Sequence, residues 1–236
     1  AGCVVMVVPS HGDRAVFREL WPQLSDGTLV VSAVKGIEVD SGMTMTEIMA
    51  AENRGGKPLH FCVLSGPSFA AEVADCQPTA VTAACVDAQA AETVQQLFAA
   101  EYFRVYAASD VKGLEISSAL KNVIAIGAGI CDGLGYGLNT RAALITRGLA
   151  EITRMGVALG AQPQTFAGLG GLGDLVLTCT GDLSRNRTVG LKLGSGLTLE
   201  QVLAQMTMVA EGVKTTRSCY HLAHRLGVEM PILEQM

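Results

Sequence analysis

The chain has 236 residues, of which 49% are hydrophobic and 17% are charged, and its net charge is −5 at neutral pH. This composition is typical of an ordered protein with a sizeable core, and it excludes a disordered chain. The mildly acidic sequence contains no run of basic residues, so we expect no nucleic-acid partner.

The first part of the chain alternates between strand-like and helix-like segments. Continuous apolar runs predict buried strands, and amphipathic runs between them predict helices. The predicted strands cover residues 3–8, 28–33, 59–64, 79–84 and 103–107, and the predicted helices cover 15–24, 45–53, 70–74 and 88–99. Such alternation predicts an α/β fold with a doubly wound (Rossmann-like) parallel sheet.

Polar residues follow three of the predicted strands. They are Pro9-Ser10-His11, Lys35-Gly36 and Ser65-Gly66-Pro67-Ser68. In doubly wound sheets ligands bind outside the carboxyl ends of the strands. Each segment alone is also compatible with an ordinary turn, in which Gly and Pro interrupt the chain.

The pattern changes at about residue 112, after which no convincing strand occurs. Helices are predicted over 113–129, 140–159, 174–179, 184–193 and 213–225, with a capping box at Thr198 and Gln201. We therefore expect a partial Rossmann-like domain over residues 1–111 and an all-helical domain over 112–236. No flexible linker separates them, so we expect a wide, packed interface.

Lys121 lies within the most apolar predicted helix. Ile116, Leu120, Val123 and Ile124 form an apolar stripe, and Lys121 is the only cation between Lys112 and Arg141. Such a lysine is either a surface or ion-paired residue, or it faces a polar cleft where burial prepares it for acid–base work.

Asp174 follows a glycine-rich run and begins a predicted helix, with Thr178 one turn further on. The position is compatible with a simple helix cap. The run from Gly168 to Gly173 matches the letters G-x-G-x-x-G, but it lies between predicted helices. A dinucleotide-binding turn must follow a strand, so we do not interpret this match as one.

The segment Ser184-Arg185-Asn186-Arg187 brings two guanidinium groups, an amide and a hydroxyl to a predicted helix start. Arginine and helix N-termini both suit phosphate, although a solvated turn would have the same composition. Together with Lys121 and Asp174, this segment predicts a site for a small phosphorylated ketone or alcohol. Lys121 would supply the proton while a nicotinamide in the α/β part supplies hydride.

These segments resemble those of the bacterial type of NAD(P)-dependent glycerol-3-phosphate dehydrogenases. The resemblance runs in order over nearly the whole chain. It is carried by Val8-Pro9-Ser10-His11, Val34-Lys35-Gly36, Ser65-Gly66-Pro67-Ser68-Phe69-Ala70, the segments 120–127, 142–148 and 171–179, Ser184-Arg185-Asn186-Arg187, and Glu211-Gly212.

The resemblance implies reduction of dihydroxyacetone phosphate to sn-glycerol 3-phosphate with NAD or NADP as cofactor, feeding phospholipid synthesis. It implies that Lys121 is the proton donor and acceptor. The implied substrate contacts are Lys35, Gly66, Ser68, Lys121, Asp174, Ser184, Arg185 and Asn186. The implied cofactor contacts are Lys35, Ala70, Arg185, Val209 and Glu211.

The chain departs from the family pattern at its beginning, where the family has a strand and a G-x-G-x-x-G turn. We expect the chain to start several elements later and to bind the cofactor weakly without that turn. Two alternatives stay open. One is a related enzyme, such as a β-hydroxyacid dehydrogenase or a ketopantoate reductase; the other is a non-catalytic module.

The remaining features indicate a cytoplasmic enzyme without metal. The seven cysteines are scattered and form no C-x-x-C pair, and the four histidines have no metal-binding spacing, which predicts reduced thiols. No apolar run has the length of a membrane span and no signal peptide is recognisable, so we expect no membrane insertion. A homodimer is compatible with an apolar face on the helical part.

Overall fold

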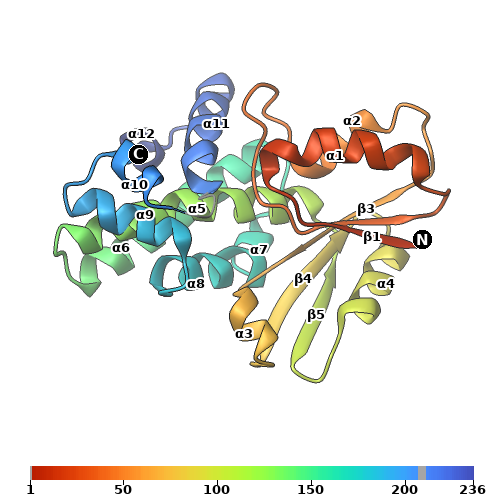
Figure 1. Ribbon diagram of the computed structural model, residues 1–236, viewed down its shortest axis with the longest axis horizontal. Helices are drawn as coiled ribbons and strands as arrows, with labels where there is room; N and C mark the ends of the chain where they lie inside the picture. The colour runs from red at the N-terminus through yellow and green to blue at the C-terminus, as the bar shows by residue number, and fades with distance from the viewer. Residues whose placement is uncertain (1, 207–210) are drawn as a thin grey trace.

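The computed structural model describes residues 2–206 and 211–236. Its first part contains a five-stranded sheet, and its second part is a group of helices beside that sheet (Figure 1). The strands run side by side in sequence order and are β1 (Cys3–Met6), β2 (Leu29–Ser32), β3 (His60–Ser65), β4 (Thr79–Cys85) and β5 (Phe103–Ala108).

The sheet is parallel at three of its four pairings. β1 pairs with β2, β2 with β3, and β4 with β5 in parallel, whereas β3 and β4 are antiparallel. The α/β class is confirmed, but the expectation of an entirely parallel sheet is wrong at this one pair. Between β3 and β4 the chain forms only the short helix α3 (Ala70–Ala74), which lies at the end of the sheet (Figure 1). The chain therefore re-enters the sheet where it left it, and β4 runs back beside β3.

Helices cover both faces of the sheet, as in a doubly wound fold. α1 (Asp13–Leu20) and α2 (Met45–Glu52) pack on one face through Phe17, Met45 and Ile48. α4 (Ala88–Phe98) packs on the other face, where Cys62 and Val81 are buried. Alternate residues of each strand thus enter two separate apolar layers, which explains the continuous apolar runs of the strands.

The second part is helical throughout its described residues. A short π-helical turn, Leu169–Gly173, precedes α8. The helices are α5 (Val111–Gly133), α6 (Leu138–Ala158), α7 (Pro163–Phe166), α8 (Asp174–Thr180), α9 (Arg185–Gly194), α10 (Leu199–Ala204), α11 (Glu211–Leu226) and α12 (Pro231–Gln235).

Helix α5 is the centre of the second part. Asp110 caps its start by accepting a hydrogen bond from Gly113 N at 2.9 Å, and every residue from Gly113 to Gly129 is buried. α6, α8, α9 and α11 all pack against it. Its length and composition would allow it to cross a membrane, but 89% of its most apolar window is buried inside the molecule, as in the core helix of a soluble protein.

Glycines allow α5 and α9 to approach backbone to backbone. A Cβ atom on Gly190 would lie 1.9 Å from the Ile126 carbonyl oxygen, and one on Gly129 would lie 2.0 Å from the Arg187 carbonyl oxygen. No side chain fits between the helices at these points. The start of α9 is consequently held at a fixed place beside the middle of α5.

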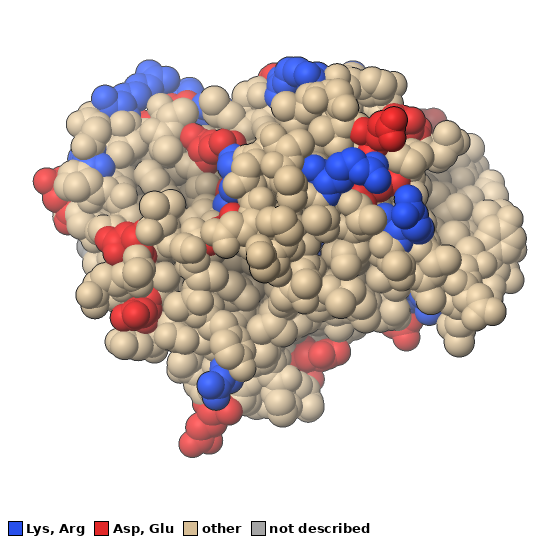
Figure 2. Space-filling model, turned by 180° about the vertical axis from the view of Figure 1, so that it is seen from behind, with Lys and Arg blue, Asp and Glu red and all other residues tan. Residues whose placement is uncertain are grey.

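One face of the molecule carries charges of both signs in small separate groups (Figure 2). On the face shown in Figure 2, lysine and arginine side chains lie beside aspartate and glutamate side chains, with broad uncharged areas between the groups. This distribution is that of an ordinary solvated surface.

Candidate active site

A cavity of about 770 Å³ lies where the carboxyl ends of β1 and β2 meet α5, α8, α9 and α11. Most of the residues singled out from the sequence line it. These are Lys35, Ser68, Ala70, Lys121, Asp174, Ser184, Arg185, Asn186 and Glu211. The cavity is therefore built by both parts of the chain, as the polar ends of the strands predicted.

Lys121 and Asp174 form a buried ion pair at the floor of this cavity. Their side chains are 5% and 2% exposed, and the Lys121 Nζ also donates a hydrogen bond to Thr178 Oγ1 at 3.0 Å. The Lys35 Nζ lies 3.3 Å from the other carboxylate oxygen of Asp174. One carboxylate thus holds two ammonium groups, one from each part of the chain.

The surroundings make Lys121 easier to deprotonate than an exposed lysine. Burial is the main cause, the positive charge of Lys35 acts in the same direction, and the pKa of Lys121 falls to about 7 although the charge of Asp174 opposes the shift. A group with a pKa near the working pH can both donate and accept a proton.

Asp174 is placed by the glycine-rich turn before it. It is the first residue of α8, whose start has no side-chain cap, so the carboxylate serves the two lysines and not its own helix. The glycines of the turn are needed for packing: a Cβ on Gly170 would lie 2.0 Å from Leu114 Cδ1, and one on Gly171 would lie 2.1 Å from the Phe166 carbonyl oxygen. α7 and not a strand precedes this turn, so the G-x-G-x-x-G match is no dinucleotide-binding turn.

The start of α9 presents Ser184, Arg185 and Asn186 to the cavity. Ser184 caps the helix by accepting a hydrogen bond from Arg187 N at 3.2 Å, and Asn186 Oδ1 accepts one from Gly212 N at 3.0 Å. Arg187 does not line the cavity. Its guanidinium binds Asp132 and Asp182, each at 2.8 Å, so the expectation of two guanidinium groups at one phosphate site is corrected to one.

The loop after β3 contributes Ser68 and Ala70 to the wall. Gly66 is not among the lining residues. Its φ is +155°, and a Cβ atom there would lie 2.8 Å from Val81 Cα on the neighbouring strand, which explains why glycine is found at this bend. Ser68 Oγ donates a hydrogen bond to the Gly66 carbonyl oxygen at 3.0 Å and so fixes the loop.

Glu211 joins the two parts of the chain at the edge of the cavity. It accepts hydrogen bonds from Ser10 Oγ at 2.5 Å and from Ser10 N at 3.4 Å. Val209, which was predicted to contact the cofactor together with Glu211, lies outside the described residues.

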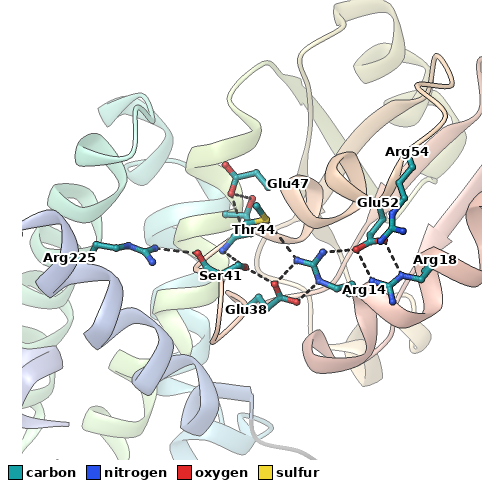
Figure 3. Close-up of polar contacts among 10 residues, drawn as sticks. Arg14, Arg18, Glu38, Ser41, Thr44, Glu47, Glu52, Arg54 and Arg225 are labelled. Carbon is teal, nitrogen blue, oxygen red and sulfur yellow. Dashed lines mark hydrogen bonds and ion pairs between the residues drawn. The ribbon is translucent and has the colours of Figure 1, made fainter.

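The segment that follows Lys35 is fixed by a chain of polar contacts (Figure 3). Arg14 holds Glu38 through two hydrogen bonds of 2.8 and 2.5 Å, and Ser41 donates to Glu38 at 2.5 Å. From the helical part, Arg225 donates to the Ser41 carbonyl oxygen at 3.3 Å. These contacts run from α1 to α11 and hold the loop between β2 and α2 beside the cavity.

The side of the cavity formed by the sheet fits a nicotinamide. The lining there is apolar, with Val7, Val8, Pro9 and Ala33, and it adjoins the Lys121–Asp174 pair. The loops after β1 and β2 touch so closely that a Cβ on Gly36 would lie 2.6 Å from Ser10 Cβ. A flat aromatic ring can lie on such a wall, and the cations Lys35 and Arg185 suit phosphate groups.

Three further polar residues at the site were given no role in the sequence prediction, although Ser10 and Thr178 were noted there. Thr178 and Asn122 line the cavity, and Ser10 binds Glu211. Two of them adjoin a residue that was predicted, since Asn122 follows Lys121 and Thr178 is one helical turn from Asp174. The helical positions of Asn122 and Thr178 could have indicated them. Whether a side chain points toward a cavity, however, can be known only from the packed structure.

Two family models match the chain, and both describe one enzyme family. The N-terminal model of NAD-dependent glycerol-3-phosphate dehydrogenase matches residues 1–91, and the C-terminal model matches residues 110–236. Glycerol-3-phosphate dehydrogenase [NAD(P)+] of Geobacter metallireducens is 60% identical over 233 residues, which are 99% of this chain and 70% of that protein.

Solved structures agree with this match. The crystal structure of glycerol-3-phosphate dehydrogenase from Coxiella burnetii superposes with a TM-score of 0.95 at 37% identity, covering 100% of this chain and 71% of that chain. The enzyme from Saccharomyces cerevisiae gives a TM-score of 0.86 at 26% identity, covering 100% and 70%. By sequence and by structure, the chain belongs to the NAD-dependent glycerol-3-phosphate dehydrogenase family.

Proposed function

We propose that the protein interconverts dihydroxyacetone phosphate and sn-glycerol 3-phosphate with NAD(P)H. The observation that carries this proposal is the buried Lys121–Asp174 pair, which shares one cavity with the arginine-bearing start of α9. Besides a hydride donor, the reduction of a phosphorylated ketone requires a proton donor and a phosphate-binding group.

The phosphate of the substrate is bound at the start of α9. Arg185 offers a planar donor fork, and the start of the helix adds partial positive charge. Ser184 and Asn186 lie on the same turn, and Lys35 reaches the cavity from the sheet. The loop containing Gly66 and Ser68 completes the substrate contacts.

Lys121 acts as the general acid in the reduction. It donates a proton to the carbonyl oxygen and stabilises the negative charge that develops there. In the reverse direction the neutral amine takes the hydroxyl proton. Asp174 orients the ammonium group and, through Lys35, ties the sheet to the helical part.

When bound, NAD(P)H would supply the hydride for the reduction, and NAD(P)+ would accept it in the reverse direction. Lys35, Ala70, Arg185, Val209 and Glu211 would hold this cofactor. Lys35 and Arg185 would then touch both ligands, which explains why a single cavity is shared by both parts of the chain. The product, glycerol 3-phosphate, would supply phospholipid synthesis in the cytoplasm, and a homodimer would be compatible with an apolar face on the helical part.

The substrate class is tested by comparing three ketones with the protein from the complete reading frame. We expect kcat/KM for dihydroxyacetone phosphate to exceed that for dihydroxyacetone at least about 100-fold, since a charge-assisted clamp on phosphate contributes roughly 3 kcal/mol. Ketopantoate, which carries a carboxylate, should react no faster than dihydroxyacetone.

Faster turnover of ketopantoate than of dihydroxyacetone phosphate would contradict the proposed substrate and favour a related reductase. Inactivity toward all three ketones, in a folded protein supplied with NADH and with NADPH, would favour a non-catalytic module.

A further inference from the structure

Cys62 and Cys85 face each other across the antiparallel pair of strands. Cys62 lies in β3 and Cys85 is the last residue of β4, and the two residues are direct partners in the ladder. Partners in an antiparallel ladder have Cα atoms about 4.5–5.5 Å apart, which is inside the range that a disulfide spans. Both side chains belong to the apolar layer under α4.

Direct partners in an antiparallel ladder point to the same face of the sheet, and Cys62 and Cys85 are buried in the same layer. Cys85 Sγ lies 3.4 Å from the carbonyl oxygen of Phe61, the residue before Cys62. Cys62 Sγ lies 3.8 Å from the carbonyl oxygen of His60, and the neighbouring Cys62 thiol lowers the pKa of Cys85 below that of an ordinary thiol. The same interaction with Cys85 raises the pKa of Cys62. Cys85 is thus the more reactive thiol of the pair.

Cys3 is the other cysteine of this layer, but it cannot replace Cys62 or Cys85 in a bridge. It lies in β1, and β2 separates it from β3. Strands in a sheet are about 4.8 Å apart, so Cys3 and Cys62 are about 10 Å apart, beyond the span of a disulfide.

We propose that Cys62 and Cys85 form a thiol–disulfide pair that a small hydroperoxide oxidises. Cys85 is 2% exposed and Cys62 is fully buried, so a bulky disulfide reagent is excluded and a small oxidant is required. Cys85 ends its strand, and the next residue, Val86, is 85% exposed, which places this thiol one residue from solvent.

The reaction balances in two steps. The Cys85 thiolate attacks the hydroperoxide oxygen, the O–O bond breaks, and Cys85 becomes a sulfenic acid, while the leaving alkoxide takes the proton that Cys85 had released and departs as an alcohol. The Cys62 sulfur then attacks Cys85, the S–O bond breaks, and water leaves with the Cys62 proton. Two thiols and one hydroperoxide thus give one disulfide, one alcohol and one water.

The disulfide would join β3 to β4, and the loop after β3 lies in the chain segment between these two strands. That loop supplies Ser68 and Ala70 to the cavity wall, and its two ends are the strands that contain the cysteines. A disulfide restricts the unfolded chain, so the oxidised protein should unfold at a temperature higher by about 5–10 °C. The inference concerns the stability of the chain and is independent of the proposed reaction.

The test uses the variant Cys76→Ser, which removes the exposed cysteine between the pair. Trypsin then leaves Cys62 and Cys85 in one peptide, because cleavage after Lys57 is blocked by Pro58 and the next basic residue is Arg104. Hydrogen peroxide is added at a dose that oxidises Cys76 in the unsubstituted protein, and the remaining thiols are alkylated. We expect this peptide to be lighter by two hydrogens and unalkylated, and its two halves to stay joined after cleavage at Glu72 until a reductant is added.

Cys62→Ala and Cys85→Ala, each in the Cys76→Ser background, should show neither the bridge nor the rise in unfolding temperature. Alkylation of both cysteines after peroxide treatment would overturn the proposal. So would a sulfinic acid on Cys85 beside a free Cys62. These two contradicting results would be observed in the Cys76→Ser protein itself, so the proposal can be refuted even if an alanine variant fails to fold.

Discussion

Lys121 is held between two opposing influences. Burial and the charge of Lys35 favour the neutral amine, whereas Asp174 favours the ammonium form. Because the first two effects are larger, the lysine exchanges its proton near neutral pH. The same lysine in solvent would stay protonated and could not accept the hydroxyl proton in the reverse reaction.

Lys121→Met should lower kcat at least about 100-fold, the usual contribution of a general acid. Methionine keeps the volume of the side chain, and Lys35 still neutralises Asp174, so the unfolding temperature should stay close to that of the unsubstituted protein. Lys112→Met is the matched control on the same helix, because Lys112 pairs with Glu47 outside the cavity. Normal turnover of Lys121→Met would remove Lys121 from the mechanism.

Substitution by alanine should have different effects at Arg185 and at Arg187. Arg185→Ala deletes a group of the cavity wall and should raise KM for the phosphorylated substrate about 10–100-fold, as expected for a charge-assisted contact. Arg187→Ala instead removes one of the two arginines that bind the half-buried Asp132, since Arg141 remains, and should lower the free energy of unfolding by about 1 kcal/mol with little change in KM. An unchanged KM for Arg185→Ala would mean that phosphate binds elsewhere.

Asp13 is a buried carboxyl group whose two oxygens have no hydrogen-bond partner. Burial first, and then the charges of Glu115 and Glu38, raise its pKa to about 7, while Arg14 acts in the opposite direction. A raised carboxyl pKa stabilises the folded protein fully below the unfolded value, and this stabilisation is lost as the pH rises through the folded value. The ionisation of Asp13 should therefore lower the free energy of unfolding as the pH rises from about 4 to about 8.

Asp13→Asn should remove that loss, since the amide does not titrate. Urea unfolding at about pH 5 and about pH 8 should show that the variant gains about 2–4 kcal/mol relative to the unsubstituted protein over this interval. Glu19→Gln, on the exposed side of the same helix, is the control and should change little between the two conditions. A parallel pH response of Asp13→Asn and the unsubstituted protein would show that Asp13 is ionised throughout.

At the level of elements, the contact between α5 and α9 determines where the phosphate-binding turn lies. Gly129, Gly133, Gly190 and Gly194 each face the backbone of the other helix. The two helices therefore pack without intervening side chains, and Ser184–Asn186 are carried close to Lys121.

Gly190→Ala should lower the free energy of unfolding by at least about 2 kcal/mol, because its Cβ would meet the Ile126 carbonyl oxygen and neither helix backbone can move away without loss of packing. KM for the phosphorylated substrate should rise as α9 shifts. Gly137→Ala, at the N-cap of α6 where no atom lies within 4 Å, should lower the free energy of unfolding by no more than about 1 kcal/mol. Equal stabilities of the two variants would contradict the close approach of the helices.

The sequence predicted the elements well because their signals are local. The helix predicted over 113–129 is observed as Val111–Gly133, and all five strands lie where the apolar runs are. The direction of β4 could not be predicted, since it depends on the path of the connection through α3 and not on the residues of the strand. The glycine contact of α5 with α9 was also missed, because the residues that approach are about sixty positions apart.

At the level of the whole molecule, two parts of the chain share one cavity and are joined around it. The Lys35–Asp174 pair, the Ser10–Glu211 contact and the polar contacts from Arg14 to Arg225 all cross from the sheet to the helices. A site of this kind holds a substrate and a cofactor between its two sides.

Motifs indicated which residues belong to this site, but not how each one is used. Lys121, Asp174 and the start of α9 were singled out by residue type and helical position, and the structure brings them into one cavity. Arg187 lies in the same short motif as Arg185 and is the same residue type, yet it is bound by Asp132, a residue 55 positions away. Only the packed structure distinguishes these two arginines.

The most direct test is to identify the product formed from dihydroxyacetone phosphate by the protein from the complete reading frame, with NADPH and separately with NADH. The account predicts sn-glycerol 3-phosphate, formed in equal amount to the cofactor oxidised, and loss of this product in Lys121→Met. Absence of the product with both cofactors, from protein whose fold is verified by circular dichroism, would contradict the assignment of the cavity as a phosphorylated-ketone reductase site.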